Sequence, residues 1–188
     1  MENIKFYNSI IKLSNTYIKL VYNPVIIGRD NIDDNKNYLF AGNHINWKDP
    51  ALVIYGVDGN LINFMAKKEL FDNKLLSPIV TRLGAFPIDR ENGDMKAVKT
   101  AINLLRNDHN VGIFPEGKRN NSLGDFKSGV PRIALMGNKE IIPFGIGGEY
   151  KHNGNLTLVF GKPINFKGIK KNEADEILKE EVKSLILK

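Results

Sequence analysis

The 188-residue sequence predicts an α/β fold in which a mostly parallel central sheet is flanked by helices. Short apolar runs alternate with segments of helical periodicity, and this alternation is typical of parallel sheets. The chain has no internal repeat, low-complexity tract or linker that would divide it. With 42% hydrophobic residues, it can bury the core of one domain.

The first predicted element is an amphipathic helix over residues 3–21. At about 100° per residue, three lysines line up on one side, and apolar side chains share a broad face opposite them. The apolar residues are Ile4, Tyr7, Ile10, Ile11, Leu13, Tyr17, Ile18, Leu20 and Val21, and the lysines are Lys5, Lys12 and Lys19. Two interpretations stay open: a helix packed on its own domain with solvated lysines, or a helix in a membrane interface with lysines near lipid phosphates.

Strands and further helices follow in alternation. Short apolar runs predict strands at residues 25–28, 38–42, 63–66, 85–88, 111–114, 141–146 and 156–160. Helical patterns predict helices at residues 50–55, 77–83, 95–105, 131–136 and 173–187. Pro50 and Pro78 suit the first turns of their helices, and Asp94 suits the N-cap of the next. The helix after Asp94 has an apolar stripe at Met95, Val98, Ile102 and Leu105.

The segment most informative about chemistry is residues 43–49, in which His44 is followed five residues later by Asp49. Histidine is the side chain best suited to move a proton near neutral pH, and a carboxylate within reach can fix its tautomer and stabilise the imidazolium. Because an apolar run ends at this segment, we expect His44 just past the carboxyl end of a strand, where ligands gather in α/β sheets. A structural histidine, and a helix cap formed by Asp49 before Pro50, are the simpler interpretations.

Two arginines also follow predicted strands. Arg90 ends residues 86–90, and Arg119 ends residues 114–119. A guanidinium binds phosphate through two parallel hydrogen bonds, which fixes orientation as well as adding affinity. Isolated arginines are also common as solvated surface residues, so spacing alone leaves both interpretations open.

Taken together, these segments resemble the glycerolipid acyltransferase family, and within it the members that acylate lysophosphatidate. The four matching blocks lie, in order, at residues 43–49, 86–90, 114–119 and 141–144. Residues 126–129 resemble the family's Phe-Lys-x-Gly segment, and the blocks span roughly residues 38–147. Lys118 and Asn120 depart from the third block, where Thr and Ser are commoner, which leaves the details of acceptor recognition open.

The resemblance implies a glycerol-3-phosphate-acyltransferase-like domain over residues 23–188, preceded by the amphipathic helix at residues 1–22. It implies that a neutral His44 acts as general base on the sn-2 hydroxyl of 1-acyl-sn-glycerol-3-phosphate, with Asp49 as orienter. The oxygen would attack the acyl donor's thioester and give phosphatidic acid, an intermediate of phospholipid biosynthesis. The chain has no cysteine and no serine beside His44, which favours direct transfer over an acyl-enzyme.

The resemblance also implies which residues bind substrate. Arg90 and Arg119 are expected to hold the acceptor's phosphate, and Lys67 is expected to add positive charge near the same phosphate site. Glu116 and Gly117 belong to the block tied to acceptor binding, where a glycine lets backbone approach a ligand. Pro143, in the fourth block, either lines the acyl end or only shapes its strand.

The expected partners are anionic or carry a thioester. Acyl-CoA or acyl-ACP (acyl carrier protein) would serve as co-substrate, with no bound cofactor and no metal, and lysophosphatidate or a similar lysolipid as acceptor. The net charge of +6 favours an anionic membrane surface as well. No run approaches the roughly 20 apolar residues of a membrane span, and no signal peptide is recognisable. We therefore expect a peripheral protein on the cytoplasmic face of the cell membrane.

Other classes of protein fit the sequence less well. A different lysolipid or hydroxyl acceptor is the nearest alternative. A non-catalytic basic protein that binds lipid or nucleic acid would fit the charge, but zinc spacing, an RNA-binding aromatic signature and a long basic cluster are all missing, so no nucleic acid is expected. A metal-dependent hydrolase would need a third ligand, and His109 and His152 lie in unrelated polar loops.

Overall fold

The computed structural model describes residues 2–89, 94–119, 124, 126, 129–152 and 154–186. Within them, the strands form one seven-stranded sheet in the order β1-β7-β6-β2-β5-β3-β4. The strands are β1 (Val25–Ile27), β2 (Leu39–Gly42), β3 (Ile62–Lys67), β4 (Phe86–Ile88), β5 (Asn110–Ile113), β6 (Ile141–Gly147) and β7 (Thr157–Phe160). Each coincides with a predicted strand, and neighbouring strands are parallel except for the antiparallel pair β6 and β7. The predicted fold class is confirmed.

The strand directions decide where functional residues can meet. Strands β6, β2, β5, β3 and β4 all run the same way, so their carboxyl ends lie along one edge of the sheet. We call this the carboxyl edge. Loops that follow these strands lie side by side there, although they are far apart in sequence.

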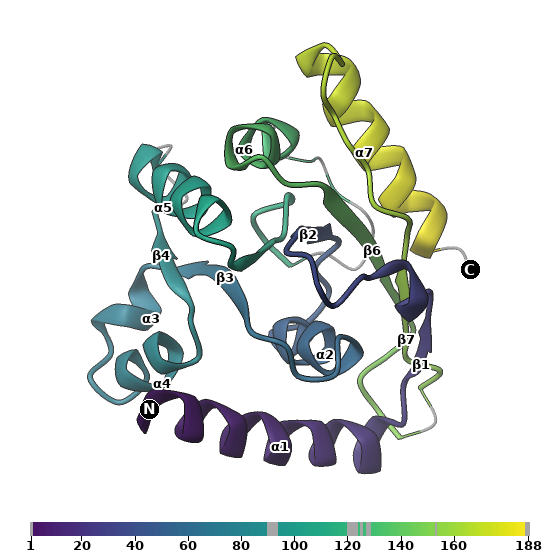
Figure 1. Cartoon of the computed structure of the whole chain (residues 1–188). Coiled ribbons are helices and arrows are strands. Elements are labelled where there is room, and N and C mark those ends of the chain that lie inside the picture. Colours follow the sequence, from purple (N-terminus) through teal and green to yellow (C-terminus); the bar gives the residue numbers. More distant parts are fainter. Residues whose placement is uncertain are drawn as a thin grey trace.

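Helices cover both faces of the sheet (Figure 1). They are α1 (Glu2–Tyr22), α2 (Asp49–Gly56), α3 (Glu69–Asp72), α4 (Ser77–Arg82), α5 (Met95–Arg106), α6 (Val130–Gly137) and α7 (Lys171–Ile186), with a 3-10 turn at Arg29–Asn31. Helices α2 and α1 lie on one face, and α5, α6 and α7 lie on the other. Each face therefore has its own hydrophobic cluster.

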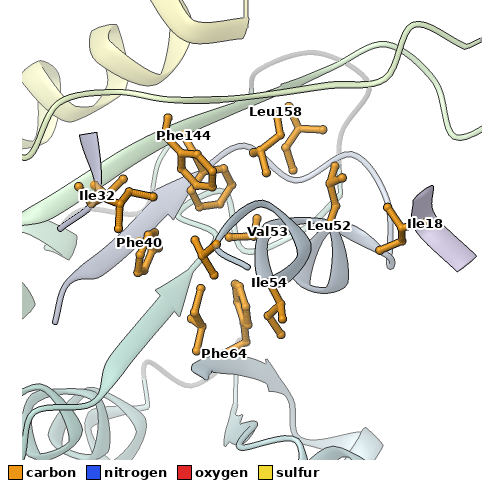
Figure 2. Close-up of a cluster of buried hydrophobic side chains, with 14 of the residues drawn as sticks. Ile18, Ile32, Phe40, Leu52, Val53, Ile54, Phe64, Phe144 and Leu158 are labelled. Carbon is orange, nitrogen blue, oxygen red and sulfur yellow. The ribbon is translucent and has the colours of Figure 1, made fainter. Parts of the chain in front are cut away.

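The cluster under α2 is built from aromatic and branched side chains. Leu52 and Val53 of α2 lie among Phe40 and Phe144 of the sheet, as Figure 2 shows. Ile18 of α1 belongs to the same cluster and is almost fully buried, so α1 forms an outer layer on α2. Burying one such side chain contributes about 1.5–3 kcal/mol to folding.

Helix α1 differs from the single broad apolar face expected from the sequence. Tyr7, Ile11 and Ile18 are buried, whereas Leu13 and Leu20 are 73% and 75% exposed. The buried residues recur at the helical spacing of one stripe, and the two exposed leucines share a second stripe on nearly the opposite side of the helix. The packing of the helix on its own domain is therefore confirmed, and its place in a membrane interface stays a prediction. None of the helices within the described residues combines the length and apolar character that a membrane span needs.

Helix α5 confirms its predicted start. The Asp94 carboxylate accepts hydrogen bonds from the backbone N–H groups of Lys96 and Ala97, at 2.9 and 3.0 Å. Its predicted stripe is confirmed at Ile102 and Leu105, which are buried, and at Val98, which packs partly buried beside them. Met95 lies in the first turn and is exposed, and the small side chains of Ala97 and Ala101 are buried as well.

The carboxyl end of β2 is tied to β6 by one side chain. The amide of Asn43 is buried, donates to the carbonyl of Ile146 at 2.9 Å, and accepts from the Ile146 N–H at 2.7 Å. This paired contact extends the β2–β6 ladder beyond the last strand residue. It fixes the point where the chain leaves the sheet toward His44.

We predict that Asn43→Ala lowers the free energy of unfolding by about 1–3 kcal/mol, because both backbone groups of Ile146 lose their buried partner. Urea denaturation measures the change. The exposed variant Asn35→Ala is the control, with an expected change within about 0.5 kcal/mol. Equal stability of the two variants would contradict the role given to Asn43.

Candidate active site

His44 and Asp49 form a buried pair directly after β2. The Nδ1 atom of His44 lies 2.7 Å from Oδ2 of Asp49, and Asp49 is 0% exposed. The same Oδ2 accepts hydrogen bonds from the backbone N–H groups of Ile45 and Asn46, at 2.7 and 2.8 Å. The loop between β2 and α2 thus wraps around one carboxylate oxygen.

This geometry corrects the cap interpretation of Asp49. Helix α2 has Lys48 at its N-cap position without a side-chain cap, and Pro50 occupies the first turn. The amides that Asp49 accepts from precede the helix, so its carboxylate organises the histidine loop and does not cap α2. The sequence spacing allowed both arrangements, and only the folded loop distinguishes them.

The imidazole plane is fixed by aromatic stacking. The ring of His44 lies 4.1 Å from that of Phe114, centroid to centroid, with 19° between their planes. Phe114 follows β5 and stacks in turn on Phe64 of β3, at 5.5 Å. In the neutral ring the hydrogen is assigned to Nδ1, because the carboxylate can only accept. The lone pair of Nε2 is then the one that can receive a proton from a substrate.

Glu116 holds the backbone of the histidine. It is buried, and its Oε1 accepts a hydrogen bond from the His44 N–H at 3.1 Å. Its Oε2 accepts from the N–H of Gly124 at 2.9 Å, which ties the loop after β5 into the same cluster. The resemblance implies a substrate-binding role for Glu116 and does not predict this contact, which depends on β5 lying beside β2.

Gly117, Arg119 and Lys67 lie along the carboxyl edge. Gly117 adopts a positive φ of 68° in a turn closed by its N–H to Phe114, a conformation that glycine adopts without strain. Arg119 is exposed just beyond this turn, and Lys67 ends β3 with its Nζ 3.0 Å from Glu69. Arg90 lies outside the described residues.

Pro143 lies within the sheet. It sits on β6 in register with Ala41, and its carbonyl accepts a hydrogen bond from the N–H of Gly161 at 2.8 Å. A Cβ atom on Gly161 would lie 2.7 Å from the proline ring, so the two residues are in close contact. These contacts support the interpretation in which Pro143 shapes its strand.

A tyrosine that the sequence did not single out completes the pair. The hydroxyl of Tyr150, in the loop after β6, donates to Oδ1 of Asp49 at 2.7 Å. Burial, and then the negative charge of Asp49, raise the pKa of Tyr150 well above its usual range. Lys48 lies nearby, with its Nζ 2.8 Å from the Tyr22 hydroxyl and 5.5 Å from the Tyr150 ring centroid. The only sequence signal for Tyr150 is its position, because it follows the predicted strand at residues 141–146, which ends at the carboxyl edge.

Metal ligation has no counterpart here among the residues that the structure describes. They contain no group of three or more His, Cys, Asp or Glu side chains placed to hold an ion. The buried carboxylates of Asp49 and Glu116 are instead occupied by hydrogen-bond donors of the protein.

Known protein families provide the decisive comparison. The sequence model of the family described as Acyltransferase matches residues 23–147, which include every loop of the site except that of Tyr150. The chain belongs to the acyltransferase family. This confirms the resemblance drawn from the motif blocks and makes the protein a transferase by family.

Two curated relatives are similar to this acyltransferase over most of its length. A 1-acyl-sn-glycerol-3-phosphate acyltransferase of Bacillus subtilis (strain 168) is 33% identical over 145 residues, which are 74% of this chain and 73% of that protein. A protein of the same name from Streptococcus pneumoniae is 35% identical over 145 residues, which are 74% of this chain and 54% of that protein. The match thus covers about half of the second relative.

A solved structure shares the fold. The 1-acyl-sn-glycerophosphate acyltransferase PlsC of Thermotoga maritima superposes with a TM-score of 0.76 and covers 96% of this chain and 79% of its own. At 23% identity, this likeness supports the fold, including the mostly parallel sheet and its flanking helices.

We predict that Glu116→Gln lowers the free energy of unfolding by about 1–3 kcal/mol, because an amide NH₂ would face one of the two backbone N–H groups that the carboxylate now accepts. Urea denaturation of the variant and of Glu176→Gln provides the comparison. Glu176 is exposed on α7, so its variant should stay within about 0.5 kcal/mol of the parent. If Glu116→Gln were as stable as the control, the stabilising role given to the hydrogen bond between Glu116 and the His44 backbone would be contradicted.

Proposed function

We propose that this acyltransferase moves a fatty acyl group from a thioester donor to the free sn-2 hydroxyl of 1-acyl-sn-glycerol-3-phosphate, giving phosphatidic acid for phospholipid biosynthesis. The observation that carries this proposal is the buried His44–Asp49 pair at the carboxyl edge of a chain in this family. The names of the two relatives support the acceptor.

The first step is a proton transfer. Nε2 of His44 accepts the hydroxyl proton while the hydroxyl oxygen attacks the thioester carbonyl. Asp49, 2.7 Å from Nδ1, stabilises the imidazolium that forms and keeps the ring in the required tautomer. Stacking on Phe114 limits ring rotation, so Nε2 is already placed when the substrate arrives.

The second step returns the proton. The tetrahedral intermediate collapses, the carbon–sulfur bond breaks, and the new ester bond remains. The leaving thiolate takes the proton from the imidazolium, which restores neutral His44. The chain has no cysteine to carry the acyl group, which favours direct transfer between the two substrates.

The acceptor's phosphate has basic partners on neighbouring strands. Strand β5 lies beside β2 and β3 lies beside β5, so Arg119 and Lys67 follow strands about 5 and 10 Å from that of His44. Arg90 follows β4, the next strand along the edge. We assign the phosphate to Arg90 and Arg119, with Lys67 adding charge and Gly117 giving close backbone approach.

The remaining assignments concern Glu116, Pro143 and the donor. Glu116 is assigned to acceptor binding in addition to its contact with the His44 backbone, and Pro143 is assigned the strand-shaping role that its contacts support. Acyl-CoA and acyl-ACP both present a thioester on a phosphate-bearing carrier, and no cofactor or metal is assigned. The net charge of +6 suits either donor.

We place the protein peripherally on an anionic membrane, at the cytoplasmic face. Leu13 and Leu20 are exposed on α1, and Lys12 and Lys19 lie exposed on the neighbouring side of the helix. Trp47, within the loop of His44, is 69% exposed, and tryptophan is favoured where apolar and aqueous layers meet. Each lysine near an anionic surface adds about 1 kcal/mol of binding free energy.

We predict that the protein converts lysophosphatidate to phosphatidic acid in detergent micelles and that His44→Ala lowers kcat by about 10²–10⁴-fold, because the general base is lost. Thin-layer chromatography with a labelled acyl group measures the product, with acyl-CoA and acyl-ACP offered separately. His109→Ala, exposed at the opposite edge, is the matched control and should keep full activity.

The outcomes separate the parts of this proposal. Faster transfer from one donor would identify the acyl donor. Activity only on another lysolipid would change the assigned acceptor and leave the assigned acyl-transfer reaction in place. No product from any hydroxyl acceptor would overturn the proposed activity. Equal activity of His44→Ala and wild type would overturn the role of His44.

We predict that the double variant Leu13→Gln/Leu20→Gln binds anionic vesicles about tenfold more weakly or worse, because two exposed apolar side chains are removed without touching the core. Vesicle co-sedimentation measures the affinity, and added salt should weaken the wild type. Leu135→Gln/Met136→Gln, on exposed residues of α6, is the control and should bind normally. Unchanged binding by the α1 variant would exclude this helix as the membrane contact.

A further inference from the structure

We propose that Tyr150 is a positioning residue for the reaction: its hydroxyl holds the second oxygen of Asp49 and thereby sets the orientation and charge of the Asp49–His44 pair. This inference rests on the proposed roles of His44 and Asp49. The family match ends at residue 147, so it does not reach this tyrosine.

The two oxygens of Asp49 have different partners. Oδ2 is shared by Nδ1 of His44 and the N–H groups of Ile45 and Asn46, all of which belong to the loop after β2. Oδ1 accepts from Tyr150, which comes from the loop after β6. A carboxylate held by one oxygen alone can pivot about it, whereas contacts on both oxygens from two loops fix its plane.

A tyrosine suits this position chemically. A buried carboxylate needs donors, and the phenol supplies one O–H without bringing a second charge into the site. Because burial and Asp49 raise the pKa of Tyr150, the phenol keeps its proton across the pH range in which a histidine base works. The hydroxyl therefore donates to Asp49 at every pH at which the reaction would run.

The surroundings of Tyr150 hold its ring in place. The turn around it is closed by hydrogen bonds from Glu149 N–H to the Gly154 carbonyl and from Gly154 N–H to the Lys151 carbonyl. The ring meets that of Tyr22 edge to face, with centroids 5.4 Å apart, at the last residue of α1. The loop after β6, helix α1 and Asp49 thus all hold this one side chain.

Loss of the phenol would change the charge that faces His44. With Oδ1 unpaired, more of the negative charge remains for the contact with Nδ1, which favours the protonated ring at higher pH. The other charged and titratable groups facing the pair are Glu116 at the His44 N–H, Lys48 beside Tyr150, and Tyr22. A Tyr150→Phe substitution removes one oxygen atom and leaves all of them in place.

The test compares Tyr150→Phe with Tyr38→Phe in the full chain. Tyr38 is buried just before β2, and its hydroxyl accepts a long hydrogen bond from the Asp33 N–H at 3.4 Å, so its variant loses a hydroxyl at the strand end opposite the site. We expect Tyr150→Phe to lower kcat about tenfold with KM unchanged. We also expect the acid limb of its kcat/KM profile to move to higher pH by about 0.5 units, and Tyr38→Phe to leave both unchanged.

An NMR titration of the His44 ring gives a readout that needs no substrate. The pH at which its signals change should rise in Tyr150→Phe and fall when a fluorinated tyrosine, a stronger donor, replaces Tyr150. The fluorinated protein keeps the Tyr150 ring and its contacts. Its titration therefore tests the proposal even if Tyr150→Phe does not fold. Identical titrations in wild type and the fluorinated protein, or equal shifts in Tyr38→Phe, would overturn the proposal. A wild type without acyl transfer but with these shifts would overturn the proposed function alone.

Discussion

The buried charge of Asp49 is the constraint on which the arrangement depends. A carboxylate removed from water is stable only when donors surround it, and here they come from the His44 ring, two loop amides and Tyr150. These donors belong to the loops after β2 and β6. The two strands therefore have to be neighbours and parallel, as they are in the sheet.

The same parallel arrangement explains why motifs scattered along the chain form one site. Strand β5 brings Phe114 against the His44 ring and Glu116 against its backbone, and β3 brings Lys67 to the same edge. Each loop supports the next, since Phe114 also stacks on Phe64. The site is thus held mainly by the order and direction of the strands, with Tyr22 of α1 adding a contact to Tyr150.

Much of this fold and site could be predicted from residues that lie close together in the sequence. Strand runs, the Asp94 cap and the pairing of His44 with Asp49 depend on residues close in sequence, and all were predicted. What failed depends on tertiary contacts. The burial of one stripe of α1 arises from packing on α2, and the contact of Tyr150 with Asp49 spans 101 residues. A side chain whose role is set by a neighbouring strand leaves no periodic signal of its own.

The exposed stripe of α1 decides which measure of acceptor concentration would control the reaction rate. With Leu13 and Leu20 resting in a bilayer, as proposed, enzyme and lysolipid would share a surface, and collisions would occur in two dimensions. The turnover rate would then follow the mole fraction of acceptor in the membrane, and diluting that surface with inert lipid would slow the reaction even at constant bulk concentration. The donor would still arrive from the aqueous side. The rate would therefore depend on the bulk concentration of the donor and on the membrane mole fraction of the acceptor.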